Sequence, residues 1–270
     1  MTKKHTTKSR THGRPPAVLV ALAIVGVGFF ALPLVGLAAR TPWSDLPTLL
    51  TSNVVLDALR ISLIASVAAT VISFIIGVPI AFVLARAEFW GKSIVRALVL
   101  LPLVLPPVVG GVALLFALGR RGVVGGPLHE ATGIVLPFSM AGVVVAVTFV
   151  AMPFVVITVE AALRNLDTRF EGAAASLGAG SWTVLRRVTI PMILPSLLSG
   201  LALTWARAFG EFGATVTFAG NIQGRTQTMP LAVFVALESD RATATALSLA
   251  MVAVSLLVLV LLRDRWWRPS

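Results

Sequence analysis

Six long stretches of this chain contain no Asp, Glu, Lys or Arg, and each is long enough to cross a membrane as a helix. A helix needs roughly 20 apolar residues to cross the ~30 Å hydrocarbon core of a bilayer. Because 57% of the 270 residues are hydrophobic and only 12% are charged, a soluble globular protein and a disordered chain are both excluded. The stretches are Pro15–Ala39, Ile61–Ala85, Ala97–Gly119, Ala131–Val159, Val188–Ala206 and Ala242–Leu262. The sequence therefore predicts an all-α polytopic membrane protein with six transmembrane helices.

The Lys and Arg residues between these stretches predict the orientation. The N-terminal tail, loops 86–96 and 160–187 and the C-terminal tail carry 15 of the 22 Lys and Arg, and the opposite loops carry six. Cytoplasmic loops are enriched in these residues, so both termini and both loops are expected on the cytoplasmic side of the inner or plasma membrane. The net charge of +11 then reflects the basic loops that set the orientation in the membrane and face its lipid, so no nucleic acid is expected as a partner.

Two sequence features concern how the helices pack. Small residues at spacings of four and three in the second stretch predict close helix packing; they are Ser62, Ser66, Thr70, Ser73 and Gly77. Prolines interrupt the third and fifth stretches, at Pro102, Pro106, Pro107, Pro191 and Pro195. Proline kinks a spanning helix, which suits a gated pathway but is equally common in structural helices.

Loop 160–187 contains a short amphipathic helix. Thr168 at the N-cap and Glu171 three residues later predict a capping box, and Gly178 and Gly180 end the helix. Its apolar stripe consists of Phe170, Ala173, Ala174 and Leu177. A helix this short is not stable in water, so the stripe must be buried. It packs on this chain's own helix ends, on lipid headgroups or on another protein, and the pattern leaves these alternatives open.

The same loop resembles the EAA loop of ABC-importer permeases. The resemblance rests on Glu171-Gly-Ala173-Ala174, then Gly178, then Val188-Thr-Ile190-Pro191, and Gly172 departs from the Glu-Ala-Ala order. It implies the type I ABC-importer permease fold, a helix over 168–177 that docks in a cytoplasmic ATPase, and alternating access. The implied partners are two cytoplasmic ATP-binding subunits, a second copy of the permease and an external binding protein. The implied coupling residues are Phe170, Glu171, Ala173, Ala174, Leu177 and Gly178.

The uncharged stretches and this resemblance together divide the chain into segments. The segments are a basic cytoplasmic tail (1–14), a first transmembrane helix (15–39), a type-1 permease domain (54–262) that contains loop 160–187, and a cytoplasmic tail (263–270). The first hydrophobic stretch is longer than the 7–15-residue core of a signal peptide, so we expect it to be retained.

A second run, Arg207–Asn221 followed by Gly224–Pro230, resembles the permeases of oxyanion importers and most closely the molybdate permeases. It implies an oxyanion substrate, with molybdate first and tungstate, sulfate or thiosulfate as alternatives. In such importers the external binding protein selects the anion, and loop 211–241 is a candidate surface for it.

Polar residues in this run are candidates for the pathway. Arg207 and Glu211 are spaced to face each other on a helix, and a charge deep in a membrane normally pairs or lines a polar cavity. The pair is either structural or a means by which Arg207 attracts anions. Thr215 and Thr217 offer neutral hydroxyl donors.

Other classes of protein fit the sequence less well. The triplet Gly91-Lys92-Ser93 lacks the preceding Gly and the strand of a nucleotide-binding loop, so ATP hydrolysis is assigned to a partner. An intramembrane enzyme needs clustered carboxylates, whereas the eleven Asp and Glu are scattered. A proton-coupled transporter needs ionisable residues at mid-span, and the six stretches have none. With no Cys and three His, neither a metal site nor a cofactor is expected.

Overall fold

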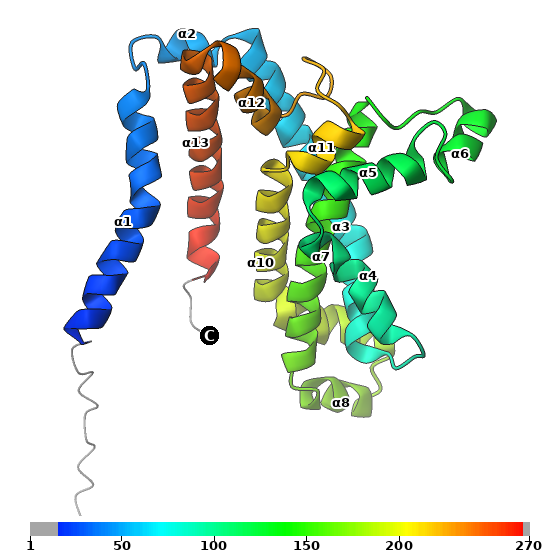
Figure 1. Cartoon of the computed structure of the whole chain (residues 1–270). Helices are drawn as coiled ribbons and strands as arrows, with labels where there is room; N and C mark the ends of the chain where they lie inside the picture. Colours follow the sequence, from blue (N-terminus) through cyan, green and yellow to red (C-terminus); the bar gives the residue numbers. More distant parts are fainter. Residues whose placement is uncertain (1–15, 267–270) are drawn as a thin grey trace, which may run out of the picture. The chain divides into compact units, whose positions relative to one another are not determined.

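The structure of the protein is a computed structural model that describes residues 16–266, with side chains described as far as residue 260. The predicted tail 1–14 and residues 267–270 of the predicted C-terminal tail lie outside the described residues. The chain divides into two compact units at Thr41. Within residues 16–266 all regular structure is helical (Figure 1).

The first unit contains one helix, α1 (Ala17–Arg40). The second unit contains, in chain order, α2 (Leu46–Leu50), α3 (Asn53–Arg86), α4 (Lys92–Val104), α5 (Pro107–Leu118), α6 (Gly125–Thr132), α7 (Met140–Asn165), α8 (Arg169–Ser176), α9 (Ser181–Val184), the π-helix η1 (Leu185–Thr189), α10 (Ile190–Phe209), α11 (Gly213–Phe218), α12 (Met229–Ser239) and α13 (Arg241–Trp266).

Five of the predicted spans are long apolar helices within the described residues: α1, α3, α7, α13 and the segment Ser181–Phe209 that α9, η1 and α10 form together. The remaining stretch, Ala97–Gly119, is two helices rather than the single span that its composition predicts. The break lies at Leu105, which is extended (φ −67°, ψ 136°). The α conformation is disfavoured before a proline, and Pro106 and Pro107 follow directly, so α4 ends there and α5 begins in a new direction (Figure 1).

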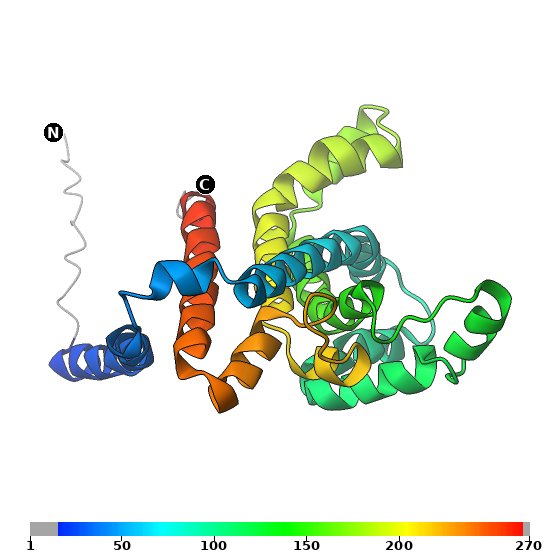
Figure 2. The same cartoon turned by 90° about the horizontal axis from the view of Figure 1, so that it is seen from above.

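Helix α7 lies at the centre of the second unit. It packs against α3, α4, α5, α10 and α11 (Figures 1 and 2). Its Val147, Val155, Val156 and Val159 are buried, because branched apolar side chains recur on every face that meets a neighbouring helix. The start of the helix is fixed by Ser139, whose hydroxyl accepts a hydrogen bond from the Gly142 N–H (3.1 Å).

The small residues of α3 pack closely against neighbouring helices, as the sequence predicts: Ser62 accepts the Met229 N–H of α12, and Gly77 lies against α7. Ser62, Ser66, Ser73 and Gly77 are buried. A Cβ atom on Gly77 would lie 2.8 Å from Val155 Cγ1, so α3 and α7 approach too closely there for a larger side chain. The absence of a side chain lets the two backbones make close van der Waals contact, which is the main source of helix association in lipid.

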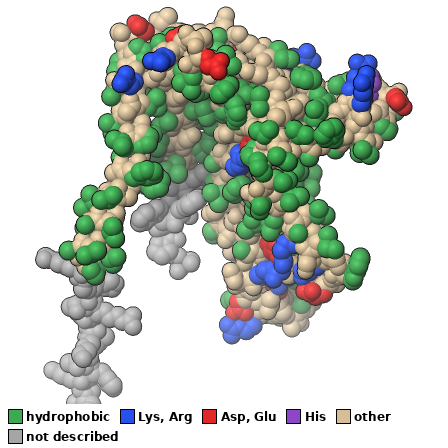
Figure 3. All heavy atoms as spheres, viewed as in Figure 1, with side chains coloured by type: hydrophobic (Ala, Val, Ile, Leu, Met, Phe, Trp, Pro, Cys, Tyr) green, Lys and Arg blue, Asp and Glu red, His purple; other side chains and the backbone are tan. Residues whose placement is uncertain are grey.

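The second unit has two chemically different ends. We call the end that carries α8 the α8 end, and α11 and α12 lie at the opposite end (Figure 1). Figure 3 shows Lys and Arg side chains gathered at the α8 end and hydrophobic side chains spread over the helices between the ends. The basic residues of the α8 end are Arg86, Lys92, Arg96, Arg164, Arg169, Arg186 and Arg187. A bundle with apolar sides and charged ends fits a bilayer as its surroundings.

Candidate functional site

Helix α8 begins differently from the predicted capping box. Thr168 has helical backbone angles (φ −66°, ψ −10°) and its side chain makes no capping hydrogen bond. Asp167 takes this place, because its Oδ1 accepts the Arg169 N–H at 3.0 Å. Glu171 does not turn back to the helix start. It is held by a cation from another helix, and a charge-assisted pair is stronger than a local neutral bond, so the capping-box prediction is wrong.

The end of α8 is as predicted from Gly178. This residue has a left-handed backbone (φ +85°), which glycine adopts without steric cost. The Gly178 N–H donates to the Ala175 carbonyl (2.9 Å), and the Ala179 N–H donates to the Ala174 carbonyl (3.1 Å). These two bonds form a Schellman motif, which stops the helix and directs the chain into α9.

The apolar stripe of α8 points away from the bundle. Phe170 is 56% exposed and Leu177 is 90% exposed, Ala173 is also exposed, and Ala174 is half-buried. The interpretation that the stripe packs on this chain's own helix ends is therefore wrong for its two large side chains. Trp182 at the start of α9 is exposed as well, so the α8–α9 segment presents three large apolar side chains outward.

The other face of α8 is turned toward the bundle across a cavity of about 390 Å³. Gly172, Ala175 and Ala179 line it on one side, and Phe82 of α3 lines it on the other. Glu171 crosses to the bundle: both of its carboxylate oxygens accept from Arg86 Nη2 (3.0 and 2.9 Å), and its Oε1 accepts the Thr189 hydroxyl (2.6 Å). Glu171 is thus both part of the predicted motif and the polar link between α8 and the rest of the chain.

A second ion cluster joins α3, α4 and α7 at the same end. Glu160 Oε1 accepts from Arg96 of α4 and from Arg164 Nε at 2.9 Å, and its side chain is only 9% exposed. Arg164 also donates to the Leu84 carbonyl at the end of α3 (3.2 Å). Sequence reasoning missed this cluster. The available signal was that Arg96 and Glu160 each adjoin the end of an uncharged stretch, and that both ends face the cytoplasm in the predicted topology.

The triplet Gly91-Lys92-Ser93 serves the turn between α3 and α4. Gly91 has a left-handed backbone (φ +83°) at the N-cap of α4. Lys92 Nζ donates to the Ala87 carbonyl and to Glu88 Oε1, both at 2.7 Å. The pKa of Glu88 lies below its ordinary value because Lys92 donates this hydrogen bond and adds positive charge. The turn lies between two helices, which is not the strand–loop–helix context of a phosphate-binding loop.

At the opposite end, Arg207 and Glu211 form the predicted pair. Arg207 Nη1 lies 2.5 Å from Glu211 Oε2, and the Glu211 side chain is only 1% exposed. Glu211 Oε1 also accepts the Ala214 N–H at 2.7 Å, so its charge lies at the start of α11. A carboxylate there satisfies a free N–H and is stabilised by the helix dipole. This geometry gives Glu211 a structural role, while Arg207 keeps part of its surface accessible.

Thr215 and Thr217 lie on α11 itself. Thr215 is fully buried and its hydroxyl has no hydrogen-bond partner, whereas the Thr217 hydroxyl donates to the Gly213 carbonyl (2.9 Å). Helix α11 lies directly on α5, where a Cβ atom on Gly111 would be 1.7 Å from Thr217 Oγ1. The four predicted pathway residues are therefore brought together at the α10–α11 corner, and two of them, Glu211 and Thr215, are buried within the chain.

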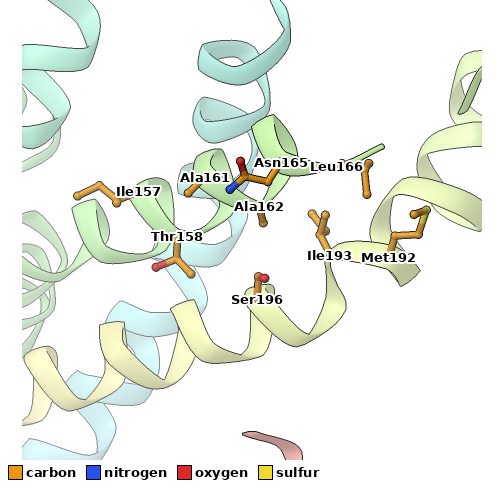
Figure 4. A pocket seen from close by; sticks show the side chains of 9 residues that line it. All are labelled: Ile157, Thr158, Ala161, Ala162, Asn165, Leu166, Met192, Ile193 and Ser196. Atoms are coloured by element: carbon orange, nitrogen blue, oxygen red, sulfur yellow. The ribbon is translucent and has the colours of Figure 1, made fainter. Parts of the chain in front are cut away.

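Uncharged polar side chains line an open groove between α7 and α10 that no motif identified. Its volume is about 450 Å³. Thr158 and Asn165 of α7 and Ser196 of α10 contribute its polar groups, with apolar side chains between them (Figure 4). Among the residues that the structure describes, no three His, Asp or Glu side chains come together as metal ligands.

Comparison with known proteins shows the family to which this chain belongs. Residues 77–267 match the family described as "Binding-protein-dependent transport system inner membrane component". The chain is 48% identical over 218 residues to the "Molybdenum transport system permease protein ModB" of Mycobacterium tuberculosis, covering 81% of this chain and 82% of that protein. It is 40% identical over 187 residues to the "Sulfate transport system permease protein CysW" of Synechococcus elongatus, covering 69% and 65%.

The fold is similar to that of chains in solved ABC transporters. A chain of the crystal structure of a bacterial alginate ABC transporter, solved in complex with an alginate pentasaccharide-bound periplasmic protein, superimposes with a TM-score of 0.74. The two chains are 19% identical, and the match covers 91% of each. At this identity the likeness concerns the arrangement of the helices, which is that of an ABC-importer permease.

Proposed function

Because this chain belongs to the family of inner-membrane components of binding-protein-dependent transport systems, we propose that it is the permease subunit of an ATP-driven molybdate importer. Members of this family are transport components rather than enzymes, so the intramembrane-enzyme alternative is set aside. ATP hydrolysis then belongs to a separate subunit, and the permease supplies the passage across the membrane.

The observation that carries the proposal is the outward stripe of α8. Its large side chains, Phe170 and Leu177, are exposed on a helix of eight residues. Such a helix is too short to be stable alone in water, and an exposed apolar patch at a charged end favours a protein partner. We assign that partner as the ATP-binding subunit, with Phe170, Glu171, Ala173, Ala174, Leu177 and Gly178 forming the coupling segment.

The proposed assembly contains two copies of this permease, two ATP-binding subunits and an external binding protein. Closure of the ATP-binding pair moves the docked α8 segments, and the bundles change between outward-open and inward-open states. We propose that the α8 end is cytoplasmic, because Lys and Arg gather there, and that both termini lie on the same side. Loop 211–241 at the opposite end is then available to the external binding protein.

The substrate assignment rests on the relatives and on the run from Arg207 to Pro230. The molybdenum permease of Mycobacterium tuberculosis matches 81% of this chain at 48% identity, whereas the sulfate permease of Synechococcus elongatus matches 69% at 40% identity. Sulfate, thiosulfate and tungstate are the alternatives. Uptake of labelled molybdate in the presence of excess competitor separates them: sulfate should not compete at equal concentration, and full competition by sulfate would move the assignment to that anion.

We further propose that Arg207 favours anions in the passage. Its guanidinium keeps part of its surface accessible beside a buried carboxylate, so it can contribute a positive potential to the path. In the Arg207→Gln variant, uptake should fall by about tenfold while the ATP-binding subunit still co-purifies. Normal uptake by this variant would remove the pathway role of Arg207.

The docking proposal is tested by adding charge to the stripe. Leu177→Asp places a carboxylate at a position where the native side chain is 90% exposed. The permease should therefore fold but lose the ATP-binding subunit in a pulldown. Ser176→Asp adds the same charge to the same helix, beside the stripe, and should retain the subunit. If both variants retain the subunit and both support uptake, the stripe is not the docking surface.

A further inference from the structure

A single carboxylate joins three elements at the α8 end. Glu171 of α8 accepts from Arg86, the last residue of α3, and from Thr189, the last residue of the π-helix η1 that leads into α10. Arg86 lies 85 residues before Glu171 in the sequence, and Thr189 lies 18 residues after it. The end of α3 and the start of α10 are therefore both linked to α8 through one side chain.

This link is stronger than an ordinary surface ion pair. Both carboxylate oxygens bind the guanidinium, and an ionised acceptor makes shorter and stronger hydrogen bonds than a neutral one. Thr189 is buried and contributes a third bond at 2.6 Å. With both charged side chains mostly covered, the pair is screened less by salt and water than an exposed pair.

Helix α8 has few other attachments to the bundle. Between its inner face and α3 lies the cavity of about 390 Å³, lined on the α8 side by Gly172 and Ala175, which have little or no side chain to fill it. Among the residues that the structure describes, the side-chain hydrogen bonds from α8 to other helices all run through Glu171. The other helix contacts of α8 are with α9 and η1, so the ion pair is the link that fixes α8 to α3.

The third partner is in an unusual local structure. Residues Leu185–Thr189 form a π-helix, which is rare and mostly found as single turns inside α-helices, often at functional sites. The π turn joins α9 to α10 as one continuous segment, and Thr189 is its last residue. The hydroxyl of Thr189 is thus placed at the point where a movement of α8 would reach the base of α10.

We infer that Arg86 is a positioning residue that, through Glu171, makes α8 move as one body with α3 and the base of α10. The inference rests on the proposed function and adds to it the route from the docked helix to the spanning helices. Docking itself uses the outward stripe, so loss of Arg86 should leave the ATP-binding subunit bound but disconnect its closure from the bundle.

The first test measures transport per ATP in the complete importer reconstituted with its binding protein. In Arg86→Gln, the ATP-binding subunit should co-purify as with the native chain, while molybdate uptake per ATP hydrolysed falls by about tenfold. Arg86→Lys keeps the charge but on a shorter side chain without the planar guanidinium, and should be intermediate. The exchanged pair Arg86→Glu with Glu171→Arg should restore part of the ratio. An unchanged ratio in Arg86→Gln would overturn the inference.

The second test measures the α3–α8 distance directly. The chain has no Cys, so Val83→Cys on α3 and Ser176→Cys on α8 give a unique pair for spin labels. In the native background the distance distribution should be narrow and the same with and without ATP, and Arg86→Gln should broaden it. A narrow distribution in Arg86→Gln, or a distance that changes with ATP in the native background, would contradict the inference.

These tests separate the inference from the function on which it rests. If no ATP-binding subunit co-purifies with the native chain, the proposed function fails. If the subunit co-purifies and drives uptake, but both measurements are insensitive to Arg86, only the positioning role fails.

Discussion

Two buried or half-buried carboxylates at the α8 end are each held by a basic side chain from another helix, and Glu160 is held also by Arg164 of its own helix. Glu160 is held by Arg96 and Arg164, and Glu171 by Arg86. The motif identified Glu171 from its neighbours in the sequence but gave no sign of Arg86, and the only sign of the Arg96–Glu160 pair was that both residues adjoin uncharged stretches at the expected cytoplasmic side. Those partners lie 64 and 85 residues away, and a contact at that separation depends on how the helices pack.

Replacement of Glu160 should destabilise the bundle. Glu160→Gln leaves two guanidinium groups without their shared anion, and because Arg96 and Arg164 are 34% and 45% exposed, the cost should be about 1–2 kcal/mol, less than for a fully buried pair. The measurement is thermal unfolding in detergent. Glu88→Gln is the matched control, because Glu88 is fully exposed at the same end and its loss should have no measurable effect. Equal stability of both variants would contradict a structural role for Glu160.

Asp240 gives a residue-scale prediction about pH. Its carboxylate accepts hydrogen bonds from the Thr243 hydroxyl and from the N–H groups of Thr243 and Ala242 at the start of α13, which lowers its pKa below the ordinary 3.8. Because the pKa of Asp240 is lower in the folded than in the unfolded protein, its ionised carboxylate stabilises the fold fully above about pH 3.8. This stabilisation is lost as the pH falls through the folded-state pKa.

The amide hydrogens in the first turn of α13 should therefore lose protection from exchange, relative to the intrinsic rate at each pH, as the pH falls below that value. In Asp240→Ala this protection should be low at every pH, and protection in the native chain that does not change with pH would contradict the capping role.

At the scale of elements, the sequence predicts a helix best where its ends carry strong local signals. Gly178 ends α8 where predicted, because the left-handed residue of a Schellman motif is a local requirement. The break between α4 and α5 had an equally local signal in Pro106-Pro107, but counting uncharged residues concealed it. The capping box failed because a long-range ion pair took Glu171 away from the helix start.

The contact between α5 and α11 gives a prediction at this scale. Gly111 faces Thr217 so closely that Gly111→Ala must move one helix, which should cost about 1–3 kcal/mol. Gly36→Ala in α1 is the control, because a Cβ atom there meets nothing within 4 Å. Thermal unfolding of both variants checks the prediction, and an unchanged midpoint for Gly111→Ala would show that the two helices are not in close contact.

At the scale of the whole molecule, this chain is one part of an assembly. Composition predicted the membrane class and most of the spans, because a bilayer imposes length and polarity on every helix. The passage itself could not be predicted in the same way. Glu211 and Thr215 are buried within the chain, while the groove with Thr158, Asn165 and Ser196 carries no motif. A groove lined by scattered small polar side chains leaves only a weak pattern in the sequence.

The exposed stripe of α8 is the feature on which the proposed assembly depends, and labelling of a cysteine at its most exposed position tests it most directly. Because the chain has no Cys, Leu177→Cys introduces a single thiol. This thiol should react quickly with a water-soluble maleimide when the permease is in a bilayer without the ATP-binding subunit. Binding of the ATP-binding subunit should slow the reaction by at least about tenfold, while Trp90→Cys, exposed at the same end, stays reactive in both states. Equal reactivity of position 177 with and without the subunit, or protection in the permease alone, would contradict docking through α8.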